Sequence, residues 1–417
     1  MHVSPSGVSN LVESGIVWNG VPVPVVSKYR YLGLLFENNC SWNAHFEEVL
    51  KKAEQRKNMF MPLWKNRHVA VEVKRIVLLT CVRPILEYGA EVWAPTTVNQ
   101  WGKLDRVQTD IIKCAMRITK ENPCSRAVLA EWGVKPMHMW LHERALEYYF
   151  RVCRMPDCRL PKQVLHAQWF GDNGTACVLP WQKYVIGLIH KYGIDLEAVA
   201  SLTAEQCKKL IKKRVAAKYA DMIVNEMASL STLKRYVDFV HPTHVDQLSF
   251  KRPRPYLCVG YPTMGIELMM RVRLGCLCVH ERTTRYSRSS EAAESDVVTI
   301  APCPACGNAN ESLCHLVFDC PRYAGLRTEL FDSLKSVSGG AAKLRHLLSI
   351  VDGKEKVSRL VSCDFWGDFE ICRIVTPAIA DFLQKAWSLR NRCKHGGDDQ
   401  SASEVQGRGA DGNNAMA

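Results

Sequence analysis

The sequence predicts a mainly α-helical protein with a small β segment at its N-terminus. Apolar residues recur at intervals of three and four in successive stretches, of which residues 204–227 form the longest. Extended and alternating patterns fall within residues 1–40. We therefore expect, in chain order, a β segment, a helical bundle, a helical linker, a compact knuckle of cysteine and histidine, and C-terminal helices.

Length and composition allow several domains. The chain has 417 residues, 47% hydrophobic and 23% charged, which is enough for two or three domains with cores of their own. The tail is expected to be disordered because it holds Gly, Asp, Ser, Asn and Ala with almost no apolar weight. The predicted segments are a β segment at 1–40, a helical bundle at 41–155, a basic helical linker at 156–300, the knuckle at 301–335, C-terminal helices at 336–395 and the tail at 396–417.

The first segment begins with a stretch that cannot be helical, because two prolines alternate with valine between Val21 and Val26. Residues 29–36 alternate and then run apolar, with Gly33 between the two halves. This pattern predicts two strands that turn at Gly33.

Helices are predicted through the bundle. Ser41 and Asn43 each offer an N-cap to the first, and Pro84 is expected to end the second, because proline has no N–H to donate. The predicted elements are a helix reaching residue 60, a helix over 69–82, a helix end and a loop over 84–93 that packs aromatic side chains, and helices over 101–115 and 137–154.

The second half of the chain is predicted to be helical after an irregular stretch over 156–200. Arg390 and Arg392 lie near the end of the last helix, where positive charge complements the helix dipole. The predicted helices cover 204–227, 319–335, 341–350 and 377–392, and the basic residues 233–239 continue the first of these.

The knuckle is the most specific motif. Cys303, Cys306, His315 and Cys320 have the spacing C-x2-C-x8-H-x4-C, which offers three thiolates and one imidazole. Four such ligands complete a tetrahedral shell, which is typical of structural rather than catalytic zinc. We therefore expect these four residues to bind Zn²⁺, with Pro321 starting the helix that follows.

Two alternatives concern other cysteines. Cys314 lies beside His315 and could replace one of the ligands, and the grouping could also arise by chance in a chain with 18 cysteines. Cys276 and Cys278, near His280, are separated by one residue and have no further ligand in step, which favours a helical pair of core cysteines over a second metal site.

The charge balance indicates an anionic partner. Fifty-five Lys and Arg against 42 Asp and Glu give a net charge of +13. No segment is long and apolar enough to span a membrane and no signal peptide is evident, so we expect an intracellular protein with no membrane partner. The net charge does not by itself identify the polyanion.

Arginine mixed with tyrosine is the best candidate for contact with RNA or DNA, because guanidinium groups pair with phosphate and aromatic rings stack on bases. Such a run is also often a solvated face. The predicted nucleic-acid-binding residues are Lys51, Lys52, Arg56 and Lys57 in the first helix and Lys251, Arg252, Arg254, Arg271, Arg273, Arg282, Arg285 and Arg288 before the knuckle.

Several short motifs together resemble the region that follows the palm in reverse transcriptases of non-LTR (LINE-like) retrotransposons. They are Tyr-Arg-Tyr-Leu-Gly at 29–33, Trp42 with His45, Pro84 with Glu-Tyr-Gly at 87–89 and Trp93, and the knuckle. The resemblance covers most of residues 20–395, and it implies a palm-edge β remnant at 1–40, a helical thumb-like domain at 41–155, a basic linker and a CCHC zinc knuckle. It also implies nucleic-acid targets in the nucleus.

No catalytic residues are predicted. The resembled family places an aromatic-x-Asp-Asp turn before residues 31–33, and no aspartate precedes Tyr29. Tyr219 with Asp221 lies within a helical pattern after that point, and Asp398-Asp399 lies in the predicted tail. The acids Asp332, Asp352, Asp364, Asp368 and Glu370 do not follow a nuclease pattern and are expected on helix surfaces.

Three functions follow as hypotheses. The first is a nucleic-acid-binding fragment of a reverse transcriptase without its catalytic palm, which could act with an intact reverse transcriptase supplied in trans. The second is an RNA-directed DNA polymerase whose open reading frame extends upstream of Met1. The third is a scaffold on which the zinc knuckle binds a protein partner.

Overall fold

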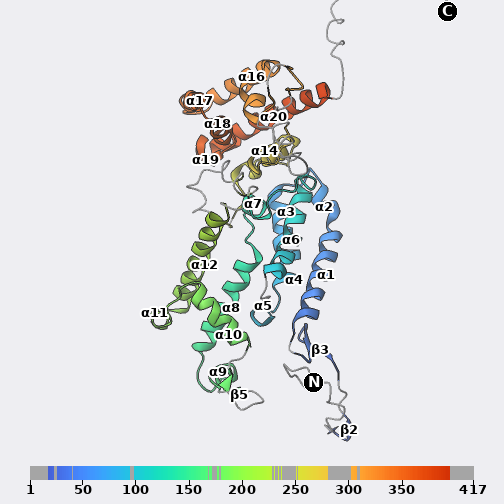
Figure 1. Ribbon diagram of the computed structural model, residues 1–417, viewed down its shortest axis with the longest axis vertical. Helices are drawn as coiled ribbons and strands as arrows, with labels where there is room; N and C mark the ends of the chain where they lie inside the picture. The colour runs from blue at the N-terminus through green and yellow to red at the C-terminus, as the bar shows by residue number, and fades with distance from the viewer. Residues whose placement is uncertain are drawn as a thin grey trace, which may run out of the picture. The chain divides into compact units, whose positions relative to one another are not determined.

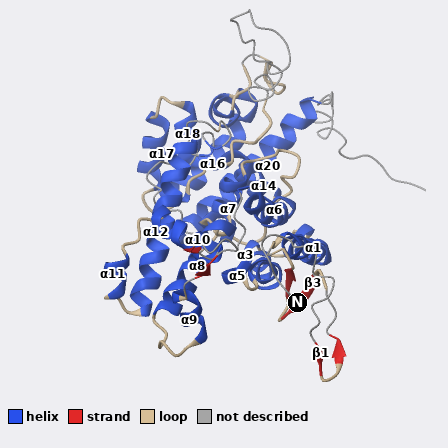
Figure 2. Cartoon of the chain, turned by 60° about the horizontal axis from the view of Figure 1, so that its bottom comes forward, coloured by secondary structure: helices blue, strands red, loops and turns tan. Residues whose placement is uncertain are grey.

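The computed structural model describes residues 17–22, 26–39, 41–93, 98–167, 169–170, 176–177, 180–227, 230, 233, 236, 250, 252–279, 302–307 and 310–394. It divides into two compact units, Met1–Cys276 and Leu277–Ala417. Helices make up most of both (Figures 1 and 2), which confirms the mainly α prediction. The predicted tail lies outside the described residues.

The strands of the first unit form small two-stranded sheets. β3 (Lys28–Tyr31) pairs antiparallel with β4 (Leu34–Glu37), as predicted. Leu32 and Gly33 both have positive φ, 46° and 84°, which is the geometry of a tight hairpin turn whose twist matches the strands. The other described pairs are β1 (Val17–Trp18) with β2 (Val21–Pro22), and β5 (Trp169–Phe170) with β6 (Ala176–Cys177).

The hairpin is held by residues distant in sequence. The hydroxyl of Tyr88 donates to the Leu32 carbonyl at 2.7 Å, and a Cβ on Gly33 would lie 3.0 Å from the Tyr88 ring. His45 Nδ1 accepts from the Leu35 N–H at 3.3 Å, and its ring meets Trp93 edge-on at 5.2 Å. Leu32, Tyr88, Trp93 and His45, which come from three of the sequence motifs, are therefore linked by contacts.

Helical structure continues through Pro84, contrary to the predicted stop. A π-helical turn, η1 (Leu78–Val82), joins α3 (Val71–Val77) to α4 (Arg83–Glu87), and Pro84 lies in the first turn of α4, where its missing N–H costs no hydrogen bond. The stretch 84–93, predicted as a helix end and a loop, holds two short helices instead, α4 and α5 (Ala90–Trp93). Leu86 and Trp93 are buried, and Trp93 thus packs inside as expected. The other helices of the bundle are α1 (Asn43–Met59), α2 (Met61–Lys65), α6 (Val98–Ala115), α7 (Ser125–Glu131) and α8 (Met137–Cys153).

A second group of helices lies beside α8. α10 (Pro180–Lys191) and α12 (Ala204–Met227) both contact α8 (Figure 1). The irregular stretch predicted over 156–200 is wrong, because α9 (Leu160–His166), α10 and α11 (Leu196–Ala200) lie there. Their apolar residues include Leu165, Val185 and Leu188, which gain burial only against other helices. The unit ends with the 3-10 turn η3 (Pro255–Cys258) and α14 (Met264–Arg273).

The second unit carries its own helices after the knuckle. η4 (His315–Asp319) and η5 (Pro321–Tyr323) lead into α16 (Ala324–Lys335), which contacts both α17 (Gly340–Ser349) and α20 (Phe369–Lys394). α18 (Gly353–Leu360) and α19 (Cys363–Trp366) lie between them in sequence. The last helix begins before Pro377, not at it as predicted, because the apolar face of Cys372, Val375 and Ile379 is buried across the proline.

Within the described residues, no helix combines the length and the apolar character that crossing a membrane requires.

Asp105 on α6 makes the stability of the first unit sensitive to pH. Its Oδ1 accepts from the Met137 N–H at 2.8 Å and from Gln108 at 3.1 Å, and burial raises its pKa to about 6. The protonated form is therefore favoured by folding, and that stability is lost as pH rises through about 6.

We expect Asp105→Asn to keep both hydrogen bonds while removing the titration. The free energy of unfolding of Asp105→Asn minus that of the original chain should be about 2 kcal/mol larger at pH 7 than at pH 4, because the original chain loses stability as Asp105 ionises between its unfolded and folded pKa values. Urea unfolding at the two pH values measures this difference, and equal differences at both would contradict the assignment.

Candidate metal centre and basic surfaces

The four predicted ligands of the knuckle come together. One ligand atom from each of Cys303, Cys306, His315 and Cys320 lies within 4.8 Å of the other three. The Cys303 and Cys320 sulfurs are 4.0 Å apart, and Cys306 Sγ is 3.4 Å from His315 Nε2. A tetrahedral ion with sulfur ligands at about 2.3 Å sets neighbouring sulfurs about 3.8 Å apart. The cluster could therefore hold a metal ion with little rearrangement.

Two local backbone features build the cluster. After Cys303 the chain turns tightly, with the Gly307 N–H donating to the Cys303 carbonyl at 2.8 Å and Gly307 at a φ of 70°, which suits glycine. On the other side, η4 is a π-helical turn in which the Cys320 N–H donates to the His315 carbonyl at 2.8 Å. An i→i+5 bond of this kind sets residues five apart on one face. His315 and Cys320 thereby face the Cys303–Cys306 turn.

The alternative cysteines take no part in the cluster. Cys314 Sγ lies 3.7 Å from Asp319 Oδ2 and is not among the grouped ligand atoms. Cys276 and Cys278 follow the end of α14 instead of lying in a helix, contrary to the predicted helical pair; Cys276 is buried and Cys278 exposed. His280 lies outside the described residues.

The cluster is anchored to the helices after it. Arg327 on α16 donates to the Cys320 carbonyl at 2.7 Å and to the Val317 carbonyl at 3.2 Å. Glu311, fully buried, forms a two-pronged ion pair with Arg390 of α20, whose Nη2 lies 2.6 Å from Glu311 Oε2. Arg390 was expected to complement a helix dipole. It is buried instead, since this carboxylate in the interior supplies the counter-charge.

Two thiols of the cluster lie in surroundings that disfavour the charged thiolate form. Burial raises the pKa of Cys303, and burial together with the neighbouring Cys303 and Cys306 raises that of Cys320 to about 12. A bound cation reverses this preference, because a coordinating thiol loses its proton. The cluster is thus suited to a cation and not to free thiolates.

The basic residues predicted on α1 lie on or near its surface. Lys51, Lys52 and Arg56 are exposed, and Lys57 is half-buried. Lys52 pairs with Glu48 at 2.5 Å, and Lys57 pairs with Glu54. Part of this charge is therefore neutralised locally, and nucleic-acid binding by these residues stays a prediction.

The arginines predicted before the knuckle have different surroundings. Arg252 is exposed, whereas Arg271 donates to the Arg117 carbonyl at 2.7 Å and pairs with Glu121 at 3.1 Å. Arg273 is only 4% exposed, so its expected contact with phosphate is wrong: its guanidinium already faces a buried carboxylate. Lys251, Arg282, Arg285 and Arg288 lie outside the described residues.

That carboxylate belongs to Glu131, at the end of α7. Arg273 donates to it through Nε at 2.9 Å and Nη2 at 3.0 Å, and the hydroxyls of Tyr236 and Tyr256 donate at 2.9 and 2.7 Å. Burial alone would raise the pKa of Glu131, but Arg273, then Arg254 and Tyr256, hold it below its usual range. The arginine-tyrosine pattern that indicated nucleic acid is here an internal network.

The same network fixes the segment around residue 252. The Arg254 N–H donates to the Glu131 carbonyl at 2.9 Å, and a Cβ on Gly133 would lie 2.0 Å from the Arg252 carbonyl oxygen. Gly133 also has a φ of 58°, which side chains rarely adopt. Glycine is therefore required for this approach of two backbones.

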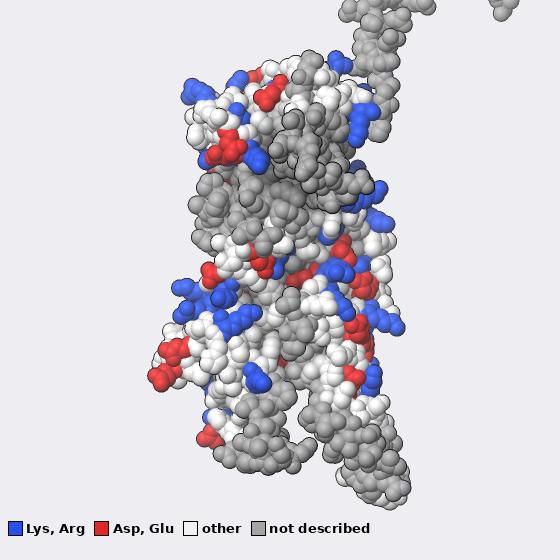
Figure 3. Space-filling view, viewed as in Figure 1, with Lys and Arg blue, Asp and Glu red and all other residues white. Residues whose placement is uncertain are grey.

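A basic surface lies on α12. Cys207, Ile211, Val215 and Tyr219 are buried on one side of this helix. Lys and Arg gather at its position in the space-filling view (Figure 3). We call the exposed cations of the other side the α12 basic face; they are Lys208, Lys209, Lys212, Lys213, Arg214 and Lys218, and none forms a salt bridge with a described acid. These residues were not among the predicted binding residues.

The acids expected on helix surfaces are exposed there. Asp332, Asp364 and Asp368 are exposed, Asp352 caps α18, and Glu370 pairs with Arg373. Asp221 is exposed on α12 and Tyr219 is buried there, so the two do not form a turn.

Comparison with known proteins found no matching family model, no matching curated protein and no matching solved structure. The class of the protein is therefore inferred from its residues and their geometry.

Proposed function

We propose that this protein binds RNA or DNA, chiefly through the α12 basic face, and holds a structural Zn²⁺ in its second unit. The observation that carries the proposal is the α12 basic face itself, six exposed cations of which none forms a salt bridge with a described acid. A nucleic-acid backbone supplies anions at regular spacing, and release of its counterions favours binding to such a surface.

The proposed zinc rests on the ligands of the cluster. Three sulfurs and one imidazole nitrogen fill all four tetrahedral positions and leave none for water or substrate, which suits a structural ion. Soft thiolate ligands with imidazole favour zinc over calcium or magnesium. The ion's role would be to hold the turn at Cys303 against the start of α16.

We further propose that the chain corresponds to the region after the palm in a non-LTR retrotransposon reverse transcriptase, which acts in the nucleus. Contacts among Leu32, Tyr88, Trp93 and His45 support this, because these four residues come from three of the motifs that carry the resemblance. The competing polymerase hypothesis is tested by the genomic sequence upstream of Met1. Palm motifs in frame would favour it, and a stop codon or frameshift would favour the binding fragment.

Charge removal on α12 tests the proposed binding. We expect the triple variant Lys208→Gln, Lys209→Gln and Lys212→Gln to weaken binding of single-stranded and duplex oligonucleotides, with a shallower slope of log affinity against log salt. The slope should fall by about 0.7 to 0.9 for each phosphate that the variant no longer neutralises. Fluorescence anisotropy across a KCl series measures both quantities.

A matched control separates local from overall charge. Lys28, Lys103 and Lys162 are paired with Glu37, Glu47 and Asp157, so replacing all three by glutamine removes the same charge elsewhere in the unit. The control should leave the slope unchanged. Equal weakening in the two triple variants, or no binding by the original chain at low salt, would argue against the proposal.

A further inference from the structure

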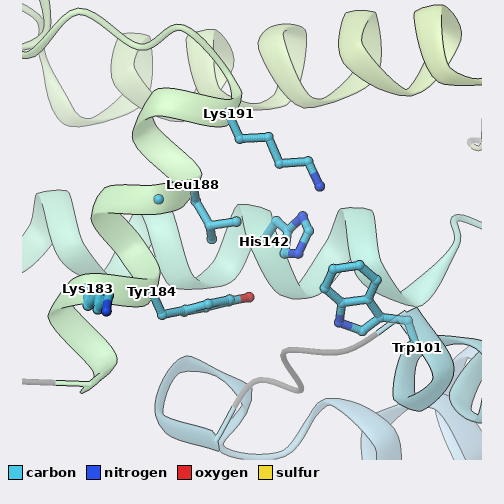
Figure 4. A pocket seen from close by; sticks show the side chains of 7 residues that line it. Trp101, His142, Lys183, Tyr184, Leu188 and Lys191 are labelled. Atoms are coloured by element: carbon cyan, nitrogen blue, oxygen red, sulfur yellow. The ribbon is translucent and has the colours of Figure 1, made fainter.

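A pocket of about 400 Å³ opens between three helices of the first unit. Trp101 comes from α6, His142 from α8, and Tyr184, Leu188 and Lys191 from α10 (Figure 4). His142 is fully buried and Leu188 is 5% exposed. The indole of Trp101 and the ring of Tyr184 bound the space, and the Tyr184 hydroxyl points toward the side on which Trp101 lies. The pocket therefore has apolar and aromatic walls of the kind that enclose a planar ligand.

Two buried polar atoms of this pocket have no hydrogen-bond partner among the described residues. They are Nε2 of His142 and the hydroxyl of Tyr184. The other nitrogen of His142 is 2.5 Å from the Tyr192 hydroxyl, and burial lowers the pKa of His142 well below its ordinary value, so the ring is neutral near pH 7. A neutral imidazole offers either an N–H or a lone pair at Nε2, and a phenol can donate or accept. The pair could thus satisfy both a donor and an acceptor on one edge of a ligand.

The rim of the pocket is basic. Lys183 and Lys191 line it, none of the described lining residues is acidic, and Lys191 Nζ lies 5.5 Å from the centre of the Trp101 ring. Burial lowers the pKa of Lys191, and the positive charge of Lys218 lowers it further. Because Lys218 belongs to the α12 basic face, the pocket lies close to that face. Tyr219 of α12 also packs on His138, one helical turn before His142, with ring centres 5.4 Å apart. Lys218, one cation of the α12 basic face, therefore lies near the opening.

We propose that this pocket receives one base of a single-stranded nucleic acid whose phosphates lie on the α12 basic face. The aromatic walls suit a planar ring, the two polar atoms suit the alternating donors and acceptors of a base edge, and the two lysines suit the adjoining phosphate. The inference rests on the proposed nucleic-acid binding and adds a base-dependent contact to it. A free nucleotide carries the same chemistry, and binding of a nucleoside monophosphate alone distinguishes it from a strand.

Tyr184→Phe tests the pocket while leaving the fold intact. It removes only a hydroxyl that has no protein partner among the described residues, so the melting temperature should stay unchanged or rise. We expect affinity for a mixed-sequence single-stranded DNA oligonucleotide to fall roughly tenfold, the worth of one hydrogen bond in a desolvated site, while the salt slope stays unchanged. A strand of the same length built from abasic residues should bind the original chain and the variant equally.

A second pair of variants blocks the space. A Cβ on Gly187 meets nothing within 4 Å, so this exposed position of α10 accepts a side chain. Gly187→Ala should bind as the original chain does, and Gly187→Leu should weaken binding of the ordinary strand but not of the abasic strand. Both should raise helix stability, because glycine is the poorer helix former.

The outcomes separate this inference from the function on which it rests. If strand binding depends on salt but neither Tyr184→Phe nor Gly187→Leu changes it, the proposed role of the pocket is overturned and the proposed function stands. Absence of strand binding in the original chain overturns both. A third outcome is that the original chain binds a nucleoside monophosphate but no strand, and that Tyr184→Phe loses this binding. That result would overturn the proposal of a bound strand and identify a free nucleotide as the ligand.

Discussion

Replacing Cys306 by serine is expected to remove the bound zinc and to unfold the start of the second unit. Cys306 Sγ lies 3.4 Å from His315 Nε2 and is one of four ligand atoms that close the shell. Binding of structural zinc contributes on the order of 10 kcal/mol to the folding of small metal domains. The free energy lost with one ligand should therefore exceed the stability that the surrounding helices supply. Metal content by mass spectrometry of the purified protein, with limited proteolysis around residues 302–335, measures the effect.

Cys314→Ser is the matched control for this change. Cys314 is adjacent to His315 in sequence, yet its sulfur is outside the grouped ligand atoms, so this variant should keep one equivalent of zinc and its resistance to protease. A Cys306→Ser protein that retained full zinc would rule out the four-ligand site. Loss of zinc in both variants would instead show that the grouping is assigned to the wrong cysteines.

Glu131→Gln is expected to destabilise the first unit by about 3 to 5 kcal/mol, the usual cost of leaving one member of a buried ion pair without its partner. Arg273 would stay charged and only 4% exposed, facing a neutral amide. Tyr236 and Tyr256 would also share a weaker acceptor. Urea unfolding followed by circular dichroism measures the destabilisation.

The control is the same substitution at an exposed site. Glu47 pairs with Lys103 at the surface, where the carboxylate side chain is 63% exposed, so Glu47→Gln should change stability by less than about 1 kcal/mol. Adding Arg273→Met to Glu131→Gln should recover part of the stability, because no unpaired charge then remains in the interior. A Glu131→Gln chain as stable as the Glu47→Gln chain would mean that the buried network does not hold this unit.

Local sequence patterns were sufficient for much of the helical framework. The periods of residues 101–115, 137–154 and 204–227 predicted α6, α8 and α12 to within a few residues. The predictions that Pro84 ends a helix and that Pro377 begins one were wrong. Pro84 lies in the first turn of a helix that follows a π-helical turn, and Pro377 lies inside a helix. At Pro377 burial of a continuous apolar face outweighs the cost of a missing hydrogen bond, whereas Pro84 lies in the first turn of α4, where no hydrogen bond is lost.

The ligands of the proposed zinc site were readable from spacing alone, because a tight turn and a helical turn bring residues three and five apart together whatever surrounds them. The fate of the charged residues was not. Arg273 and Arg390 meet Glu131 and Glu311, which lie 142 and 79 positions away. The sequence by itself determined the long helices α6, α8 and α12 and the Cys/His cluster, since these depend on neighbours along the chain. Only the tertiary structure decided which cations face solvent and which are buried, because that depends on segments distant in sequence packing together.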